Sequence, residues 1–211
     1  MAVTIEETSE TELTQSIVTP SVRLTFTWVD DRWVHALVLS TSAGIPSSLV
    51  QSMDRDEGES PLSPAYQQLH LQREGDAQLA MLVGQSGHHH YSAAFTVREQ
   101  PNGSISIDAD VADRLMKSTE AAQPLACTYQ VALGPGQIEA GSPGLVRWQV
   151  QSPAGSLELA TVEQPGGKTL LSVCGAPSDR SLAQLLASSE ASGPTQRCGY
   201  RWTWEPVPLP A

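Results

Sequence analysis

Three consecutive histidines, His88 to His90, are the feature of this sequence whose chemistry is easiest to name. Imidazole nitrogens bind transition metals such as zinc, copper, nickel and iron. On a strand His88 and His90 point the same way, and His70 lies on the polar side of its own predicted strand, which suggests a three-histidine site. The expected strand register argues against it, because it separates His70 from His90 by about 10 Å and from His88 by about 16 Å. A solvated junction of loop and strand is the simpler interpretation, and a metal such as zinc is the alternative.

His35 and an aromatic stripe near the C-terminus are the candidate ligand-binding residues. His35 alternates with Trp33 and other apolar residues, so it is expected to be a buried core histidine or, alternatively, a ligand or general base in a cavity. Tyr200, Trp202 and Trp204 alternate along the last predicted strand. Core packing explains such a stripe, and the functional alternative is an exposed platform for sugar rings or for a proline-rich segment of a partner.

The motifs of common enzymes are missing from the sequence. It contains no G-x-S-x-G, H-E-x-x-H, P-loop, dinucleotide-binding or C-x-x-C motif. The acidic stretch 54–59 lacks the spacing and the flanking helices of an EF-hand, so calcium is not favoured. Cys127, Cys174 and Cys198 are odd in number and widely spaced, which favours buried reduced thiols over a disulfide between two of them.

The charge of the chain limits its partners. The net charge is −11 and the pI is about 4.7, and the only lysines are Lys117 and Lys168. Binding of nucleic acid or of an anionic membrane surface needs clustered Lys and Arg, so neither partner is expected. No apolar run approaches the ~18 residues of a membrane span. The N-terminus does not resemble a signal peptide, so we expect a cytoplasmic protein.

Alternating apolar residues predict an all-β antiparallel fold, a sandwich or a closed or partly closed barrel of about ten strands. One or two short helices are expected: a helix that begins at Asp179, and a turn or helix after a strand that ends near Val111. The predicted strands are 22–29, 32–40, 66–73, 77–84, 90–99, 104–111, 125–133, 145–151, 155–163, 168–175 and 197–205.

One domain is expected between two tails. Residues 1–20 are acidic and are predicted to be a flexible tail, with an edge strand at Val3 to Ile5 as the alternative. Residues 21–206 are predicted to form a single β domain, and 207–211 an extended tail. The first and last core strands contain the similar sequences TFTW (25–28) and RWTW (201–204), which would suit neighbouring strands that close a barrel.

These observations favour a non-catalytic β module that binds a protein partner, associates with itself or serves structurally, with no cofactor. One alternative is a barrel that carries a small apolar ligand near His35. The other is a metal-dependent site at the 88–90 histidines.

Overall fold

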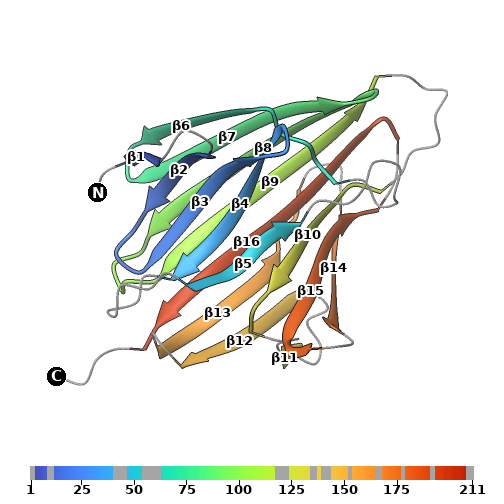
Figure 1. Ribbon diagram of the computed structural model, residues 1–211. Helices are drawn as coiled ribbons and strands as arrows, with labels where there is room; N and C mark the ends of the chain where they lie inside the picture. Colours follow the sequence, from blue (N-terminus) through green and yellow to red (C-terminus); the bar gives the residue numbers. More distant parts are fainter. Residues whose placement is uncertain are drawn as a thin grey trace.

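The protein is a sandwich of two antiparallel β-sheets (Figure 1). This computed structural model describes residues 3–8, 12–39, 47–53, 63–116, 124–133, 137–138, 144–151, 154–164, 168–176, 179–190 and 193–207. The predicted all-β antiparallel fold is confirmed, and of the two expected architectures the structure has the sandwich and not a closed barrel. The described residues contain sixteen strands, more than the ten expected.

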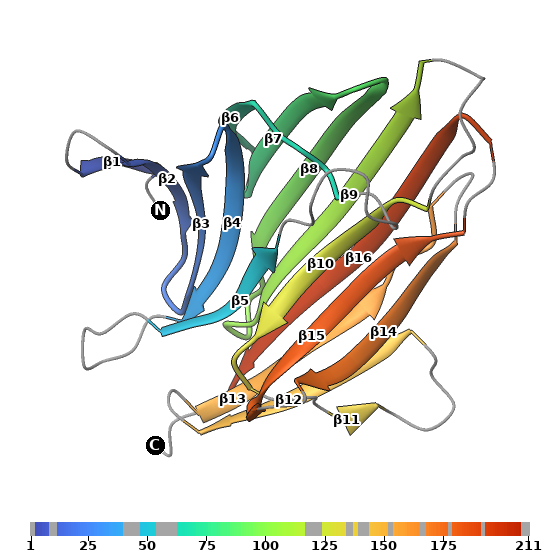
Figure 2. The same cartoon turned by 45° about the vertical axis from the view of Figure 1, so that its right-hand side comes forward.

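The first sheet has eight strands, seen side by side in Figure 2. In spatial order they are β1 (Val3–Thr8), β2 (Glu12–Val18), β3 (Val22–Val29), β4 (Arg32–Leu39), β5 (Ser47–Met53), β10 (Ala126–Val131), β15 (Asp179–Ser189) and β14 (Thr169–Ala176).

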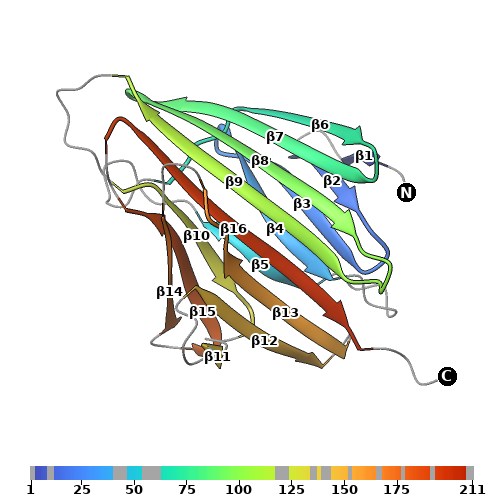
Figure 3. The same ribbon diagram turned by 180° about the vertical axis from the view of Figure 1, so that it is seen from behind.

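The second sheet also has eight strands, and Figure 3 shows its outer face. In spatial order they are β11 (Gln137–Ile138), β12 (Leu145–Gln151), β13 (Ala154–Thr161), β16 (Thr195–Pro206), β9 (Ile105–Leu115), β8 (His89–Glu99), β7 (Ala77–Ser86) and β6 (Gln68–Glu74).

Local sequence explains the hairpins. In β3 and β4 buried and half-buried residues alternate, as expected for strands with one face on the core. Asp30 and Asp31 join the two strands with φ angles of 47° and 64°, a conformation that aspartate tolerates better than most residues. Gly103, with φ of 81°, provides the same conformation between β8 and β9, where Asn102-Gly103 is a sequence typical of tight hairpin turns.

One apolar core fills the space between the sheets, and both sheets contribute to it. Phe26 of the first sheet packs edge-on against Phe95 of the second, with ring centroids 6.0 Å apart. The alternating apolar residues of β8, which include Tyr91 and Val97, are buried. The core therefore depends on contacts between residues that are far apart in the sequence.

The two expected helices are absent from the described residues, which contain no helix. The stretch predicted to be a helix from Asp179 is β15, which pairs with β10 on one side and β14 on the other. Strand pairing on both sides outweighs the helical spacing of its leucines, because tertiary contacts override local propensity. Similarly, β9 continues to Leu115 beyond the expected end near Val111, since it pairs with β8 and β16 over that length.

Two further expectations differ from the structure. Residues 3–8 and 12–18 form the strands β1 and β2 rather than a flexible tail, and β1 lies at the edge of its sheet, as the alternative proposed. The TFTW and RWTW segments are not neighbours, because β3 and β16 belong to different sheets. The acidic stretch 54–59 and residues 208–211 of the predicted C-terminal tail lie outside the described residues. None of the described residues belongs to a helix long and apolar enough to cross a lipid bilayer.

Candidate functional site

A chain of polar side chains connects the two sheets inside the apolar core. His35 of β4 lies with its Nε2 atom 2.9 Å from the hydroxyl of Tyr129 on β10. The Tyr129 hydroxyl is also hydrogen-bonded to the hydroxyl of Tyr200, which belongs to β16 of the opposite sheet. The sequence placed His35 and Tyr200 on core faces of their strands, but it gave no sign that Tyr129 joins them.

Burial keeps all three groups of this chain uncharged. Desolvation lowers the pKa of His35 to about 4, because the protonated imidazole has lost its water shell. Desolvation also raises the pKa values of Tyr129 and Tyr200 well above 10. At neutral pH the hydrogen-bonded side chains are therefore one neutral imidazole and two neutral phenols. Such groups can transmit a hydrogen bond, and none of them carries a charge.

The space around His35 is small. A cavity of about 20 Å³ is lined by His35, Ser63, Tyr66 and Thr128 among others, and a second, of about 10 Å³, is lined by His35 with Phe95 and Trp202 among others. His35 Nδ1, Ser63 Oγ and Thr128 Oγ1 are buried and have no hydrogen-bond partner among the described residues. The larger cavity has room for one water-sized molecule. Pockets for small organic ligands have volumes of hundreds of cubic ångströms, so these described cavities do not suit an apolar cargo.

The aromatic stripe packs inside the sandwich. Tyr200, Trp202 and Trp204 are 0 %, 4 % and 2 % exposed. Trp202 contacts the ring of Tyr129 edge-on, with centroids 5.7 Å apart, and packs against Trp148 at 6.0 Å. The stripe therefore lies in the core, and it does not form the exposed platform that the sequence left open.

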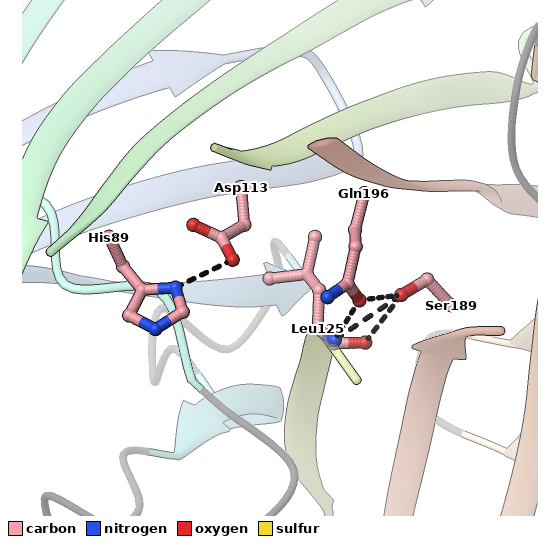
Figure 4. A network of polar contacts seen from close by, with 5 residues as sticks. All are labelled: His89, Asp113, Leu125, Ser189 and Gln196. Carbon is pink, nitrogen blue, oxygen red and sulfur yellow. Dashed lines mark hydrogen bonds and ion pairs between the residues drawn. The ribbon is translucent and has the colours of Figure 1, made fainter. Parts of the chain in front are cut away.

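A second histidine forms a polar pair near one end of β8 and β9. His89 Nδ1 lies 2.8 Å from Oδ2 of Asp113, which is 1 % exposed (Figure 4). Burial raises the pKa of Asp113 above 3.8, against the opposing effect of the hydrogen bond to His89. The other carboxylate oxygen, Oδ1, has no partner among the described residues. His89 stacks on Tyr91, as expected for residues on the same strand face.

A neighbouring network does not complete a catalytic triad with this pair. Gln196 is the cross-strand partner of Asp113. Its Oε1 atom accepts hydrogen bonds from Ser189 Oγ at 2.7 Å and from the backbone N–H of Leu125 at 2.8 Å. Figure 4 shows His89 on the far side of Asp113 from Ser189. The serine therefore belongs to a structural network that joins the sheets, and the histidine does not activate it.

The histidines predicted as metal ligands do not converge. His70 pairs with Met81, which pairs with Ala94, so His90 lies four residues along β8, about 13 Å away. His88 lies in the turn before β8 rather than on the strand. Among the described residues no group of three His, Cys, Asp or Glu side chains is placed to hold a metal ion. The strand register expected from the sequence differs by one residue from the observed register, and the predicted separation of His70 from His90 is similar to the observed one.

The outer face of the second sheet carries arginines that are mostly paired with carboxylates. Asp108 forms ion pairs with both Arg98, at 3.3 Å, and Arg201, at 2.5 Å. Arg197 forms an ion pair with Asp110. Arg147 pairs in the same way with Glu158 on the neighbouring strand.

Arg114 is the exception on this outer face. It projects from β9 beside His90 of β8 and is exposed. Its guanidinium has no ion pair among the described residues, whereas Arg98, Arg147, Arg197 and Arg201 each have one. No sequence signal separates Arg114 from the paired arginines, because pairing depends on the register between strands.

A groove of about 590 Å³ lies beside Arg114. One row across three strands forms part of its floor, since Gln85 pairs with His90 and His90 with Arg114. Gln67 forms a wall: its Oε1 accepts the backbone N–H of Gln85 at 2.7 Å, and its Nε2 donates to the Gln85 carbonyl at 3.3 Å. Gly84 permits this approach, because a Cβ atom there would lie 1.8 Å from the carbonyl oxygen of Ala65. The groove is therefore held in place before any ligand arrives.

Most of the described residues that line the groove have polar side chains. They offer amide, hydroxyl, imidazole and guanidinium groups and no carboxylate; the residues are Gln67, Gln68, Val83, Gly84, Gln85, His90, Tyr91, Ser92 and Arg114. Comparison of the chain with protein-family models gave no match, and comparison with curated proteins gave none either. The geometry of the groove therefore provides the functional argument.

Proposed function

We propose that this protein is a non-catalytic β-sandwich module that binds an acidic segment of a protein partner in the groove beside Arg114. The observation that supports the proposal is the exposed guanidinium of Arg114, which has no carboxylate partner among the described residues. A guanidinium forms strong, directional hydrogen bonds with a carboxylate, so a partner's Glu or Asp side chain would complete the pattern that the rest of this face already has.

The size and rigidity of the groove support the same proposal. Its volume of about 590 Å³ lies within the range of ligand sites, in contrast to the cavities of about 20 and 10 Å³ beside His35. The two hydrogen bonds between Gln67 and Gln85 hold one wall in place. A preformed site binds its partner with a smaller loss of conformational entropy, which favours tight binding.

The net charge of −11 makes binding of an acidic peptide a selective test of the proposal. An acidic probe is repelled by the protein as a whole, so binding requires a local basic site. A fluorescein-labelled octaglutamate peptide is titrated with the protein, and its anisotropy is measured at low and at physiological salt. Binding is expected, with a dissociation constant that rises with salt because the contacts are ionic.

Arg114→Gln and Arg98→Gln are the matched variants, because each removes one exposed arginine from the same face. Arg114→Gln is expected to weaken peptide binding about fivefold to tenfold, the effect of one charge-assisted contact. Arg98→Gln is expected to change it less than about twofold, since Arg98 lies eight residues along β8 from His90, about 26 Å away. Equal losses in the two variants, or no binding by the wild type, would contradict the proposal.

A further inference from the structure

Two buried thiols, one from each sheet, meet in the middle of the sandwich. Cys127 of β10 is 8 % exposed and Cys198 of β16 is 0 % exposed, and both are free cysteines. They lie close enough for each thiol to shift the pKa of the other. The pairing is independent of the groove and of any partner that binds there.

The backbone fixes this meeting. Cys127 pairs in register with Ala187 on the adjacent strand β15. Cys198 Sγ lies 3.3 Å from the carbonyl oxygen of that same Ala187, so its S–H can be donated either to this carbonyl or to the Cys127 sulfur. The strand pairing of the first sheet thus places the Cys198 thiol beside the residue that is the direct cross-strand neighbour of Cys127.

Cys127 is the thiol of the pair that ionises first. The hydrogen bond from Cys198 lowers the pKa of Cys127, and a hydrogen bond from Tyr200 acts in the same direction, against the effect of burial. For Cys198 the same contact with Cys127 and its burial raise the pKa. Because the thiolate is the nucleophile in thiol chemistry, the two cysteines have unequal roles.

A route for a small oxidant reaches this pair. Cys127 is one of the residues that line the cavity of about 20 Å³ beside His35. Met53, which is 37 % exposed, lines the same cavity, so the cavity extends from the surface toward Cys127. It has room for one water-sized molecule, and hydrogen peroxide is only slightly larger than water.

We propose that Cys127 and Cys198 form an oxidation-sensitive thiol pair that hydrogen peroxide converts into a disulfide between the two sheets. The Cys127 thiolate attacks one oxygen of the peroxide, the O–O bond breaks, and the departing hydroxide takes up the proton that Cys127 lost. The Cys198 sulfur then attacks the sulfenic acid sulfur of Cys127, the S–O bond breaks, and the proton of Cys198 leaves with the second hydroxide. Two thiols and one peroxide become one disulfide and two molecules of water.

The disulfide connects strands that are distant in the sequence. It closes the loop of residues 127–198 and removes many conformations of the unfolded chain. The oxidised protein is therefore expected to unfold about 5–10 °C above the reduced protein. A rise of this kind requires that the bond form without distortion of the two sheets.

The test counts thiols before and after oxidation. Reduced protein is treated with hydrogen peroxide at neutral pH, denatured in an alkylating agent and weighed by intact mass spectrometry. Three alkylated thiols are expected before treatment and one after it, and a non-reducing peptide map is expected to join Cys127 to Cys198. Differential scanning calorimetry of the same two samples gives the shift in unfolding temperature.

Serine variants supply the controls. Cys127→Ser and Cys198→Ser are each expected to abolish both the bridge and the peroxide-induced rise in unfolding temperature, whereas Cys174→Ser keeps both. The comparison of oxidised with reduced wild type does not depend on any variant folding. Retention of all three thiols after peroxide, a bridge that includes Cys174, or a bridge between two molecules would each overturn the proposal.

Discussion

The two histidine environments of this protein differ in what surrounds the imidazole. His35 lies between the sheets and is hydrogen-bonded to a neutral phenol, so burial alone lowers its pKa to about 4. His89 lies where β8 begins and is hydrogen-bonded to the buried carboxyl group of Asp113. Burial raises the pKa of this carboxyl group. Burial therefore pushes both sites toward the uncharged form. Because one site holds a base and the other an acid, their effects on stability have opposite signs with pH.

The largest expected effect is the pH dependence that His35 imposes on folding. Its folded pKa of about 4 lies below its ordinary value of 6.5, so between these values the unfolded chain binds a proton that the folded protein does not. Stability is expected to fall by about 3 kcal/mol as pH falls from 6.5 to 4. Urea unfolding across this range measures the loss.

His35→Gln tests the assignment, because the amide cannot titrate and can still hydrogen-bond to Tyr129. The variant is expected to lose most of the decrease in stability between pH 6.5 and 4. His70→Gln, on the exposed outer face of β6, is the matched control and is expected to keep it. A decrease that survives in His35→Gln would show that the buried imidazole does not control acid stability.

A smaller effect is expected from the hydroxyl that joins His35 to the opposite sheet. Tyr129→Phe removes a group with two partners and leaves His35 Nε2 and the Tyr200 hydroxyl without it, at a cost of about 2 kcal/mol. Tyr200→Phe keeps the bond between Tyr129 and His35 and is expected to cost about 1 kcal/mol. The free energies of unfolding at pH 7 give the comparison. If Tyr200→Phe costs as much as Tyr129→Phe, the bond to His35 contributes nothing to stability.

The smallest effect is expected at Asp113, and it has the opposite sign. Its folded pKa is raised above 3.8, so its contribution to stability is full below 3.8 and is lost as pH rises through the folded pKa. In the His35→Gln background, stability is therefore expected to decline slightly as pH rises through that window. Adding Asp113→Asn removes the decline, and Asp76→Asn in the exposed β6–β7 turn leaves it. An increase of stability with pH at Asp113 would mean that the bond to His89 outweighs burial.

Much of the architecture could be predicted from local patterns, and the errors have a common cause. Alternation along 22–29 and 32–40 identified the β3–β4 hairpin, because period two places every second residue on the core. The leucines after Asp179 have helical spacing, yet β15 is a strand because β10 and β14 pair with it on both sides. Propensity is a weak constraint wherever two neighbouring strands already offer hydrogen bonds.

The candidate sites were harder to predict than the strands. The sequence singled out His88 to His90 as three similar residues, but the fold gives them three surroundings: a turn for His88, a buried carboxyl for His89 and an exposed groove for His90. Arg114 is distinguished from Arg197 only because strand register brings a carboxylate to one and not to the other.

By itself the sequence determined which residues face the core, because alternation and turn residues act over neighbouring positions. It placed His35, Cys127, Tyr200 and Trp202 in the interior, where the structure has them. Only the tertiary structure decided which interior residues meet. His35, Tyr129 and Tyr200 form one hydrogen-bonded chain, and Cys198 lies beside the cross-strand partner of Cys127, because strands far apart in the sequence lie opposite each other in two packed sheets. Such contacts depend on strand order and register, which no local pattern encodes.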